Sequence, residues 1–417
     1  MEFKEYFLKD ICYFQEGYVN PKQTISDYFD GEVKWLRAND LQNNYVYNTS
    51  RTLTKAGFES AGKSAKLFKP NTIAISKSGT IGRLGILKDY MCGNRAVINI
   101  ECNNDIIDIK YLYYFLLFNR PYIESLAQGS VQKNLYVFIL EKVKIKLPNK
   151  DIQKKIIKIL NDIDNKIELN NKINDNLHKL SDELYKGWFI DYNYPNFDGK
   201  LKESNLGLIP ENWRIERLDN IAECQNGYAF YKDGYDDDGL MVIDLGNINL
   251  NSTFIYTNAD KHIKPDRVEK DKFEKYKVYK NDLIMVMTDR KATMELLGKT
   301  GKIYEDNEFL LNQRMYRIRS EINTNYLYTA LNNDLILNKL KSKALGSVQK
   351  YVNTGHINEL EILIGTDEIM DKFSKMVDPI YAEIENRTIE NTRLEKLRDT
   401  LLPKLMNGEI DLDKIEI

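Results

Sequence analysis

The pentapeptide GSVQK occurs twice in the chain, at residues 129–133 and again at residues 346–350. A glycine and a serine ahead of a Gln-Lys pair are typical of an exposed turn, which adds little to a core. The offset of 217 residues between Gly129 and Gly346 continues without a gap through the segment that follows each copy, where apolar positions coincide. A fixed offset with matched apolar positions indicates an internal duplication.

Upstream of the pentapeptide the two copies match with small insertions. LKDICYFQEGY at residues 8–18 parallels LDNIAECQNGY at residues 218–228. Short runs typical of β-strands follow, namely TIAIS, GRLGIL, AVINI and VKIKL in the first copy and LIMVM, GKIY, RMYRIR and LEILI in the second. Helical patterns at Ile109–Phe118 and Asn325–Leu340 interrupt these runs. The sequence therefore predicts an α+β fold with one irregular globule in each copy.

A different pattern closes each copy, where apolar residues recur at alternating steps of four and three around a polar centre. This spacing predicts a coiled-coil seam on a helix of roughly 50 Å in each copy, and the two helices are expected to pair antiparallel. The seam positions are Ile152, Ile156, Ile159, Ile163, Ile173, Leu177, Leu180 and Leu184, and then Ile369, Phe373, Met376, Ile380, Leu394, Leu397 and Leu401. The polar centres hold Lys166 and Asn170 in one helix and Glu383, Arg387 and Glu390 in the other.

Composition limits the classes of function. The chain has 417 residues and suits two domains of middling size, and no apolar run approaches the ~20 residues that cross a bilayer. We therefore expect a cytoplasmic protein. Four cysteines without a CxxC pair, and three histidines without a ligand spacing, predict reduced cysteines and no metal site.

Charge is unevenly distributed although the net charge is only −2. Between Arg51 and Arg95 nine Lys or Arg accompany two acids, and between Lys277 and Arg319 nine accompany six. Two different globules on a rigid spacer suit a periodic, bipartite target, and two half-sites on one face of B-DNA lie ~34 Å apart. The pattern predicts a protein that binds double-stranded DNA through basic segments of its globules.

Candidate DNA contacts come from the loops. In SKSGTIGRLG, Lys77 and Arg83 flank glycines that permit close approach to a backbone; the segment lacks the GK[ST] ending of a nucleotide-binding loop. The pentapeptide is either a domain-closing turn or a phosphate contact, since two readers of different sequences share it. The full candidate set is Arg37, Asn39, Lys77, Arg83, Arg95, Gln132 and Lys133 in the first copy and Arg290, Lys291, Lys299, Arg314, Gln349 and Lys350 in the second, with Asp244 and Asn247 as further base-reading candidates.

The whole chain resembles the specificity subunit of a Type I restriction-modification system. The likeness is carried by the LxxIxxxxxGY start of each copy, IPENW at residues 209–213, both GSVQK turns, and the helix endings LSDELYKGWF and LRDTLLPKLMNGEI. Two departures are that the first copy has no IPxxW segment before Leu8 and that Gly365 stands where Pro148 precedes the first helix.

The resemblance implies a division of roles along the chain. Residues 1–147 and 213–364 would be target-recognition domains, 148–190 a first spacer helix, 191–212 a linker, and 365–417 a second spacer helix with a C-terminal tail. The helices would pair and dock partners through Ile156, Ile163, Leu177, Leu184, Phe373, Ile380, Leu394 and Leu401. The implied partners are two methyltransferase subunits carrying S-adenosylmethionine and restriction subunits that use ATP and Mg²⁺, while this chain would hold no cofactor and catalyse nothing.

Two alternatives belong to other classes. A self-contained modification enzyme needs a catalytic motif, and the nearest approaches are DPIY at residues 378–381 and NYPNF at residues 193–197, within the predicted helix and linker. A purely structural coiled-coil scaffold is the other. Selective binding to one split DNA sequence, with methylation only after methyltransferase subunits are added, excludes both.

Overall fold

The computed structural model describes residues 3–129, 132–230, 234–257, 260–289, 293–347 and 349–412. Contacts divide the chain into two compact units. Unit 1 comprises Met1–Lys166 and Leu394–Ile417, and unit 2 comprises Ile167–Arg393. Both boundaries fall inside long helices, so the sequence-based domain boundaries stay a prediction. Within the described part of the chain, no helix combines the length and the apolar character that crossing a bilayer requires.

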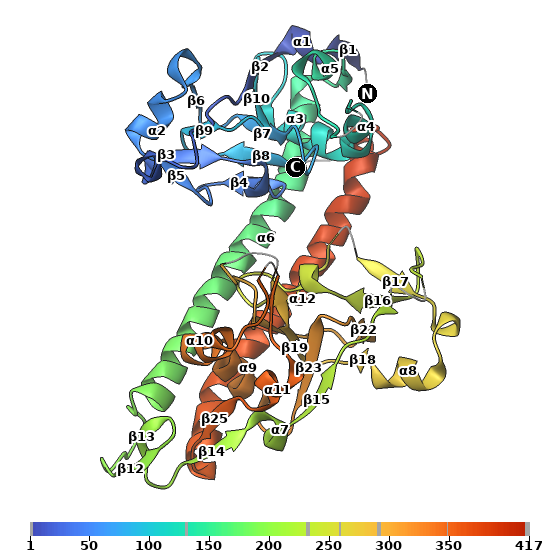
Figure 1. Ribbon diagram of the computed structural model, residues 1–417. Coiled ribbons are helices and arrows are strands. Elements are labelled where there is room, and N and C mark those ends of the chain that lie inside the picture. Colours follow the sequence, from blue (N-terminus) through green and yellow to red (C-terminus); the bar gives the residue numbers. More distant parts are fainter. Residues whose placement is uncertain are drawn as a thin grey trace. The chain divides into compact units, whose positions relative to one another are not determined.

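Unit 1 contains two mixed sheets and a two-stranded ribbon (Figure 1). The first sheet runs in the order β2 (Cys12–Glu16), β10 (Val97–Cys102), β7 (Ile73–Ser76), β8 (Leu84–Leu87) and β4 (Asn44–Val46). The second runs β5 (Thr52–Leu53), β3 (Phe29–Leu36), β9 (Met91–Gly93) and β6 (Leu67–Phe68), and the ribbon pairs β1 (Lys4–Phe7) with β11 (Lys144–Leu147). The helices are α1 (Leu8–Ile11), α2 (Lys55–Glu59), α3 (Ile109–Phe118), α4 (Arg120–Ser125) and α5 (Val137–Leu140).

The central strand β7 of the first sheet has an almost continuous apolar sequence because both of its faces are buried. Its side chains alternate between two cores, with Ile73 and Ile75 in the cluster that contains α3 and Ala74 in a second cluster with Leu36 and Phe68. A strand buried on both faces has no polar face, so its sequence loses the alternation of a surface strand.

Unit 2 repeats this topology except that its first sheet has no counterpart of β4. Its first sheet runs β15 (Ala222–Asn226), β23 (Met315–Ser320), β19 (Leu283–Val286) and β21 (Thr300–Lys302), and its second runs β17 (Lys261–Ile263), β16 (Leu240–Ile243), β22 (Phe309–Leu311) and β18 (Lys277–Val278). Two ribbons pair β14 (Arg214–Arg217) with β25 (Glu361–Ile364) and β20 (Thr288–Asp289) with β24 (Lys350–Tyr351). The helices are α7 (Leu218–Ile221), α8 (Lys270–Lys275), α9 (Thr324–Asn332), α10 (Asp334–Ser342) and α11 (Thr354–Asn358).

The shared topology confirms both the internal duplication and the α+β class. The parallel pair β3 and β9 in unit 1 has its counterpart in the parallel pair β16 and β22 in unit 2. The helix predicted at Ile109–Phe118 is observed as α3. The single helix predicted at Asn325–Leu340 is wrong, because the side chain of Asn333 accepts a hydrogen bond from the Leu335 amide and caps a new helix, α10.

Two long helices follow the α+β parts of the two copies. The first, α6, covers Lys150–Tyr185 in 36 residues and ends in a π-helical turn at Lys186–Ile190; the second, α12, covers Asp367–Met406 in 40 residues. The segment that directly follows α6 forms the hairpin of β12 (Leu201–Ser204) and β13 (Gly207–Pro210).

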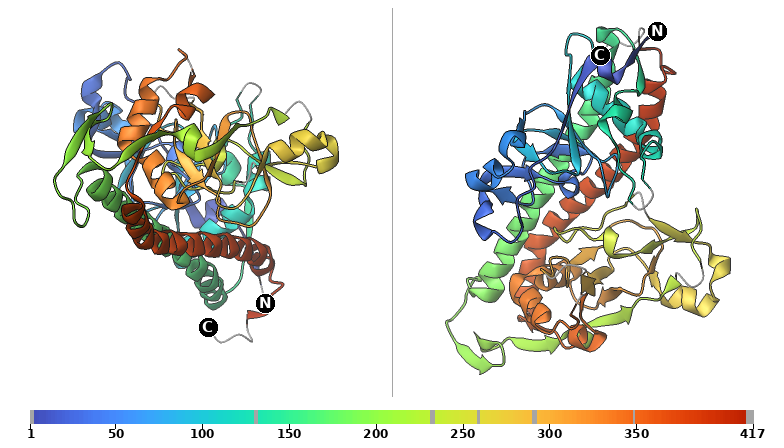
Figure 2. Two further views of the ribbon diagram at one scale, coloured as in Figure 1. Left: turned by 90° about the horizontal axis from the view of Figure 1, so that it is seen from below. Right: turned by 45° about the horizontal axis from the view of Figure 1, so that its top comes forward.

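Within each unit α6 and α12 lie side by side and antiparallel (Figure 2). In unit 2, Asn170 Nδ2 donates to Asn391 Oδ1 at 2.9 Å, and Ser181 Oγ lies 3.0 Å from the Tyr381 hydroxyl. Residue numbers therefore fall along α12 as they rise along α6. The predicted antiparallel pair with a polar centre at Asn170 is confirmed.

The predicted seam is wrong at three of its positions. Leu180, Met376 and Leu397 are 48%, 41% and 47% exposed. The buried stripe runs instead through polar residues that an apolar pattern skips, among them Asn174 and Ser181. A seven-residue repeat continues through these positions, whereas the hydrophobic pattern jumps from Ile163 to Ile173 and shifts its phase.

Equivalent positions of the helix pair carry different chemistry in the two units. In unit 1, Arg398 Nη1 donates to Asp164 Oδ1 at 3.1 Å. The offset of 217 residues relates Asp164 to Tyr381 and Ser181 to Arg398, so the matching site in unit 2 is the hydroxyl pair Ser181–Tyr381. One ion pair and one pair of hydroxyls thus occupy corresponding places.

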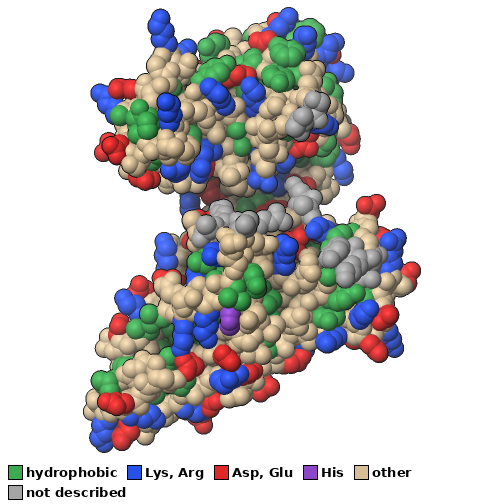
Figure 3. Space-filling view, viewed as in Figure 1, with side chains coloured by type: hydrophobic (Ala, Val, Ile, Leu, Met, Phe, Trp, Pro, Cys, Tyr) green, Lys and Arg blue, Asp and Glu red, His purple; other side chains and the backbone are tan. Residues whose placement is uncertain are grey.

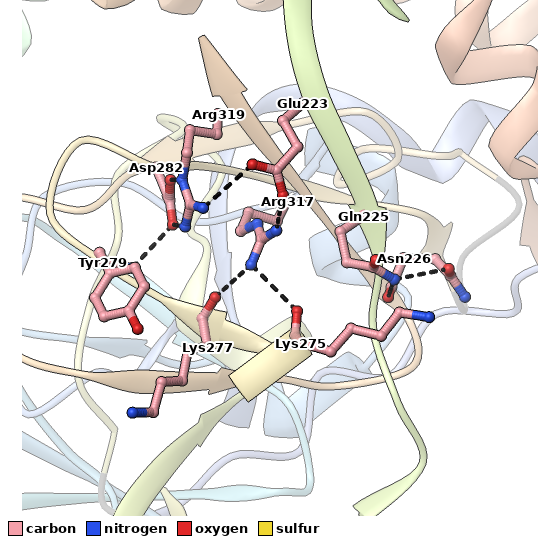
Figure 4. A network of polar contacts seen from close by, with 9 residues as sticks. All are labelled: Glu223, Gln225, Asn226, Lys275, Lys277, Tyr279, Asp282, Arg317 and Arg319. Atoms are coloured by element: carbon pink, nitrogen blue, oxygen red, sulfur yellow. Dashed lines mark hydrogen bonds and ion pairs between the residues drawn. The ribbon is translucent and has the colours of Figure 1, made fainter. Parts of the chain in front are cut away.

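Arg317 fastens the two sheets of unit 2 together (Figure 4). Its side chain on β23 is buried, and Nη1 donates to the backbone carbonyls of Lys277 at 2.5 Å and Lys275 at 3.3 Å. Nη2 donates to Glu223 Oε1 at 2.6 Å. Because these carbonyls end α8 and begin β18, a single guanidinium joins the second sheet to the first.

Candidate nucleic-acid interface

The strand ends of unit 1 bring its predicted DNA contacts to one edge. Val97 at the start of β10 lies opposite Ser76 at the end of β7, and Ile98 lies opposite Glu16 at the end of β2. In the second sheet β3 and β9 run parallel and end together, with Leu36 opposite Gly93. The loops leaving these strands therefore share one side of the unit.

Backbone hydrogen bonds tie these loops to one another. The Lys77 amide donates to the Ala96 carbonyl at 2.7 Å, and the Leu135 amide donates to the Lys77 carbonyl at 2.9 Å. The Asn94 amide donates to the Leu36 carbonyl at 3.0 Å. We call this region the loop edge of unit 1, and it brings together Arg37, Asn39, Lys77, Arg83, Arg95, Gln132 and Lys133.

The glycine that opens the repeated pentapeptide has the same backbone setting in both units. Gly129 and Gly346 have φ values of 136° and 89°, which favour glycine. A Cβ atom at either position would overlap the carbonyl oxygen three residues later, that of Gln132 or Gln349. Bridges flanking the turn pair 128 with 134 and 345 with 351. Local backbone geometry thus requires the glycine, while Ser130, Val131 and Val348 lie outside the described residues.

The side chains after this glycine differ in exposure between the units. Gln132 and Lys133 are exposed, whereas Gln349 and Lys350 are half-buried. Lys350 lies on β24, where its backbone is opposite that of Asp289 in the antiparallel strand β20. The lysine of the unit 1 turn is therefore the more accessible to a phosphate.

Lys77 is held rather than free. Its Nζ lies 2.9 Å from Glu16 Oε1. Burial favours the neutral form of that carboxyl, but hydrogen bonds from Lys77 and Tyr18 outweigh it and lower the pKa of Glu16. The ion pair positions the loop that carries Arg83.

Arg37 is oriented by neighbours, while two other candidates project into solvent. Arg37 Nη2 donates to Ser50 Oγ at 2.6 Å, and its guanidinium lies 5.6 Å from the Trp35 ring centroid. Asn39 and Arg95 are exposed. The Nε atom of Arg37 is buried and has no hydrogen-bond partner, so one donor of this side chain is unused.

Unit 2 has the corresponding loop edge. The Met287 amide donates to the Arg314 carbonyl at 3.0 Å, and the Val352 amide donates to the Met287 carbonyl at 2.9 Å, which places Arg314 near the turn that carries Lys350. Asp244 follows β16 at the same edge, because the Asn312 amide donates to the Ile243 carbonyl at 3.2 Å. The candidates Arg290 and Lys291 lie outside the described residues.

Asn247, a base-reading candidate, is buried. Its Nδ2 donates to the Ile255 carbonyl at 3.1 Å and to Asp260 Oδ1 at 2.8 Å. Its Oδ1 accepts from the Asp244 amide at 2.9 Å. The amide is fully engaged in holding its loop.

Lys299 lines a cavity of about 360 Å³ in unit 2 together with His178 and Asp182 of α6. Burial, and then the neighbouring Lys341, lowers the pKa of Lys299. Burial also lowers the pKa of His178 to about 4, so the imidazole is neutral at physiological pH. Arg83 occupies the equivalent position on the loop edge of unit 1, so the two copies use this position differently.

Several Lys side chains between Lys277 and Arg319 make contacts within unit 2 that stabilise the fold. Lys277 lies 3.0 Å from Glu274 and Lys280 lies 2.6 Å from Glu385. Lys302 is buried and donates to Asn325 Oδ1 at 2.7 Å. The face seen in Figure 3 carries Lys and Arg side chains interspersed with Asp and Glu. Counting charges along the sequence therefore overstates what unit 2 offers to DNA.

The segment DPIY, one of the two nearest to a methyltransferase motif, is part of a long helix. Asp378, which begins DPIY, lies within α12 and accepts hydrogen bonds from the side-chain amides of Asn323 and Asn325. Among the described residues, no three His, Cys, Asp or Glu side chains gather where they could hold a metal ion.

Comparison with known proteins gives one consistent result. A family model described as the Type I restriction modification DNA specificity domain matches residues 1–179 and 210–395. The chain is 24% identical to the Type I restriction enzyme MjaIX specificity subunit of Methanocaldococcus jannaschii, over 98% of this chain and 93% of that protein. It is 25% identical to the HindI specificity subunit of Haemophilus influenzae, over 98% of this chain and 100% of that protein.

A solved structure shares the fold. The crystal structure of a Type I restriction-modification S subunit from M. genitalium matches with a TM-score of 0.52 and 17% sequence identity, over 97% of this chain and 96% of that chain. At this identity the likeness concerns the fold, with two mixed-sheet units and two long packed helices.

Proposed function

The chain belongs to the family of Type I restriction-modification DNA specificity subunits, and from that premise we propose that its two units read the two halves of a split, asymmetric DNA sequence. In such a system the specificity subunit is the DNA-binding, non-catalytic component. One observation carries the proposal. Both units build a loop edge on the same strand order, yet present different side chains there.

The proposed roles follow the division read from the sequence. Residues 1–147 and 213–364 act as target-recognition domains, and the helices within 148–190 and 365–417 act as a spacer between them. The continuity of α6 over 36 residues and of α12 over 40 supports a rigid spacer. Residues 191–212, with the β12–β13 hairpin, return the chain to the second domain.

The candidate contacts divide by role. Lys133 and Lys350 contact phosphates, because a residue shared by readers of different sequences carries no sequence information. Base reading falls to loop residues that differ between the units, such as Arg37 and Asn39 in unit 1 and Arg314 in unit 2. Arg83, Arg95, Gln132 and Gln349 complete the proposed surface, together with Lys77, Arg290, Lys291 and Lys299.

Two copies of a methyltransferase subunit are the proposed partners of the helix pair. Leu180 and Leu397 are related by the offset of 217 residues and are 48% and 47% exposed. Equivalent apolar side chains, equally exposed on equivalent helices, suit two copies of one partner. S-adenosylmethionine belongs to those subunits, and ATP and Mg²⁺ to restriction subunits that join the complex on cytoplasmic DNA.

Methylome sequencing of cells with and without the gene tests the function. We expect one bipartite adenine mark to disappear when the gene is removed and to return on complementation. Unchanged adenine marks would refute the assignment. Binding of S-adenosylmethionine by the isolated chain would favour a self-contained modification enzyme instead.

Deleting seven residues from the centre of each helix, 169–175 and 386–392, tests the spacer. Each deletion shortens its helix by about 10 Å and keeps the seam in phase. We expect loss of methylation at the original spacing and new marks whose halves lie closer together. Retention of the original spacing would rule out the helices as the spacer.

Replacing Lys133 or Lys350 by alanine tests the phosphate assignment. Each variant is expected to weaken binding to specific and non-specific DNA alike and to reduce the slope of log K against log[salt] by about 1. Fluorescence anisotropy titrations at several salt concentrations measure both. An unchanged slope, or a loss confined to one DNA sequence, contradicts the assignment. Lys154, exposed on α6 and outside both basic segments, provides the matched control.

A further inference from the structure

Two cysteines that lie far apart in the sequence face each other in unit 1. Cys12 on β2 and Cys102 on β10 are direct partners in the antiparallel ladder of these neighbouring strands (Figure 1). Both thiols are free and partly buried against the core that contains α3. Opposite residues of a ladder project from the same face, so the two sulfur atoms share one side of the sheet.

The ladder places this pair at a site of close approach. The Gly17 amide donates to the Val97 carbonyl and the Asn103 amide donates to the Ile11 carbonyl, which marks those two pairs as hydrogen-bonded. Hydrogen-bonded and non-hydrogen-bonded pairs alternate, so Cys12 and Cys102 form a non-hydrogen-bonded pair. The Cys12 amide accordingly donates to Leu8 within α1.

Non-hydrogen-bonded pairs have Cα atoms ~4.5 Å apart, within the ~4.4–6.8 Å that a disulfide spans. A hollow of about 310 Å³, lined by both cysteines with Asp10, Tyr13 and Glu101, opens beside them and gives a small oxidant access. The matching ladder position in unit 2 pairs Ala222 with Ser320, so only unit 1 has this arrangement at that position.

We propose that Cys12 and Cys102 form a redox modification site at which oxidation joins β2 to β10 through a disulfide. With hydrogen peroxide, one thiolate attacks a peroxide oxygen, the O–O bond breaks, and a sulfenic acid and hydroxide result; the hydroxide takes up the proton that the thiol had released and becomes water. The second thiol attacks that sulfur, the S–S bond forms, the S–O bond breaks and a second water leaves. Two cysteines lose two electrons and two protons, and one peroxide becomes two waters.

The surroundings of the thiols set the rate of this step. Burial, and then the neighbouring Asp108, raises the pKa of Cys102 to about 11. Burial, and then the neighbouring Cys102, raises the pKa of Cys12 further still. The thiolate is the reactive form, so cross-linking is expected to be slow at pH 7 and to accelerate by roughly tenfold for each pH unit below the pKa.

The test treats the native full-length chain with hydrogen peroxide and then measures intact mass and non-reduced peptide maps. We expect a loss of about 2 Da, for two hydrogen atoms, and a cross-link between the peptides that hold Cys12 and Cys102. Cys12→Ser and Cys102→Ser each abolish the cross-link. Cys224→Ser retains it, because Cys224 lies opposite Ile318 in unit 2.

Thermal unfolding then measures what the cross-link does to unit 1. It closes a loop of about ninety residues, so the Tm of unit 1 is expected to rise by roughly 5–10 °C and to fall back on reduction. Peroxide-treated Cys12→Ser is the control and is expected to show no rise. A native chain that keeps its mass, cross-links only when denatured, or cross-links without a rise in Tm would overturn the proposal.

Discussion

Replacing Arg317 with methionine is expected to lower the free energy of unfolding of unit 2 by about 3–5 kcal/mol. Arg317 is 4% exposed, and its guanidinium donates to two backbone carbonyls and to Glu223. Methionine retains most of the side-chain volume but donates no hydrogen bond, so the Lys275 and Lys277 carbonyls lose their partner. Urea unfolding followed by circular dichroism measures the loss.

Arg214→Met is the matched control for this experiment. Arg214 makes a surface ion pair with Glu216, and a pair of that kind contributes less than about 1 kcal/mol. If the two substitutions lower the free energy of unfolding equally, the hydrogen bonds of Arg317 do not stabilise the contact between the sheets. Under the proposed division of roles, specific DNA binding by the Arg317 variant is expected to fail at the half-site assigned to unit 2 and to persist at the other half-site.

Replacing both Leu180 and Leu397 with glutamate is expected to weaken docking of the methyltransferase subunits by roughly 100-fold at each site. Both side chains are exposed on long helices, so glutamate, a good helix former, leaves the fold intact. At the interface it buries a charge where an apolar contact stood. Sedimentation velocity with the purified methyltransferase subunit measures assembly, and methylation of the bipartite site measures the consequence.

The single substitutions sharpen this test. If the two proposed docking sites are equivalent but separate, each single variant leaves a complex with one methyltransferase subunit. Leu335→Glu is the control, because Leu335 is 61% exposed on α10 and is not on either long helix. Full assembly by the double variant would place the docking surface elsewhere.

The duplicated plan could be predicted from the sequence because it depends on local patterns. Strand runs such as TIAIS, the glycine of each GSVQK turn and the two helices are each determined by neighbours in the chain. The break at Asn333 was missed because a polar cap inside an apolar pattern interrupts a helix without changing its periodicity.

Other features depend on partners that are distant in the sequence. The nine cations between Lys277 and Arg319 suggested a DNA surface, yet Arg317 pairs with Glu223 and Lys280 with Glu385. No local pattern distinguishes a cation committed to an acid about a hundred residues away from one that is available to DNA. The sequence also did not predict that Cys12 and Cys102 lie opposite each other, because only the register of β2 and β10 brings them together.

The unequal pairs along the helices, Asp164–Arg398 and Ser181–Tyr381, have a consequence for the ancestry of the chain. If two identical first halves associated, each Asp164 would face a serine; if two second halves did, each Arg398 would face a tyrosine. An assembly of first halves leaves the half-buried Asp164 without its counter-ion, and one of second halves leaves Arg398 with only its exposed neighbour Asp399. The two halves are complementary rather than identical at these positions. A homodimer of either half, which would read a palindrome, would therefore first require substitutions at these positions.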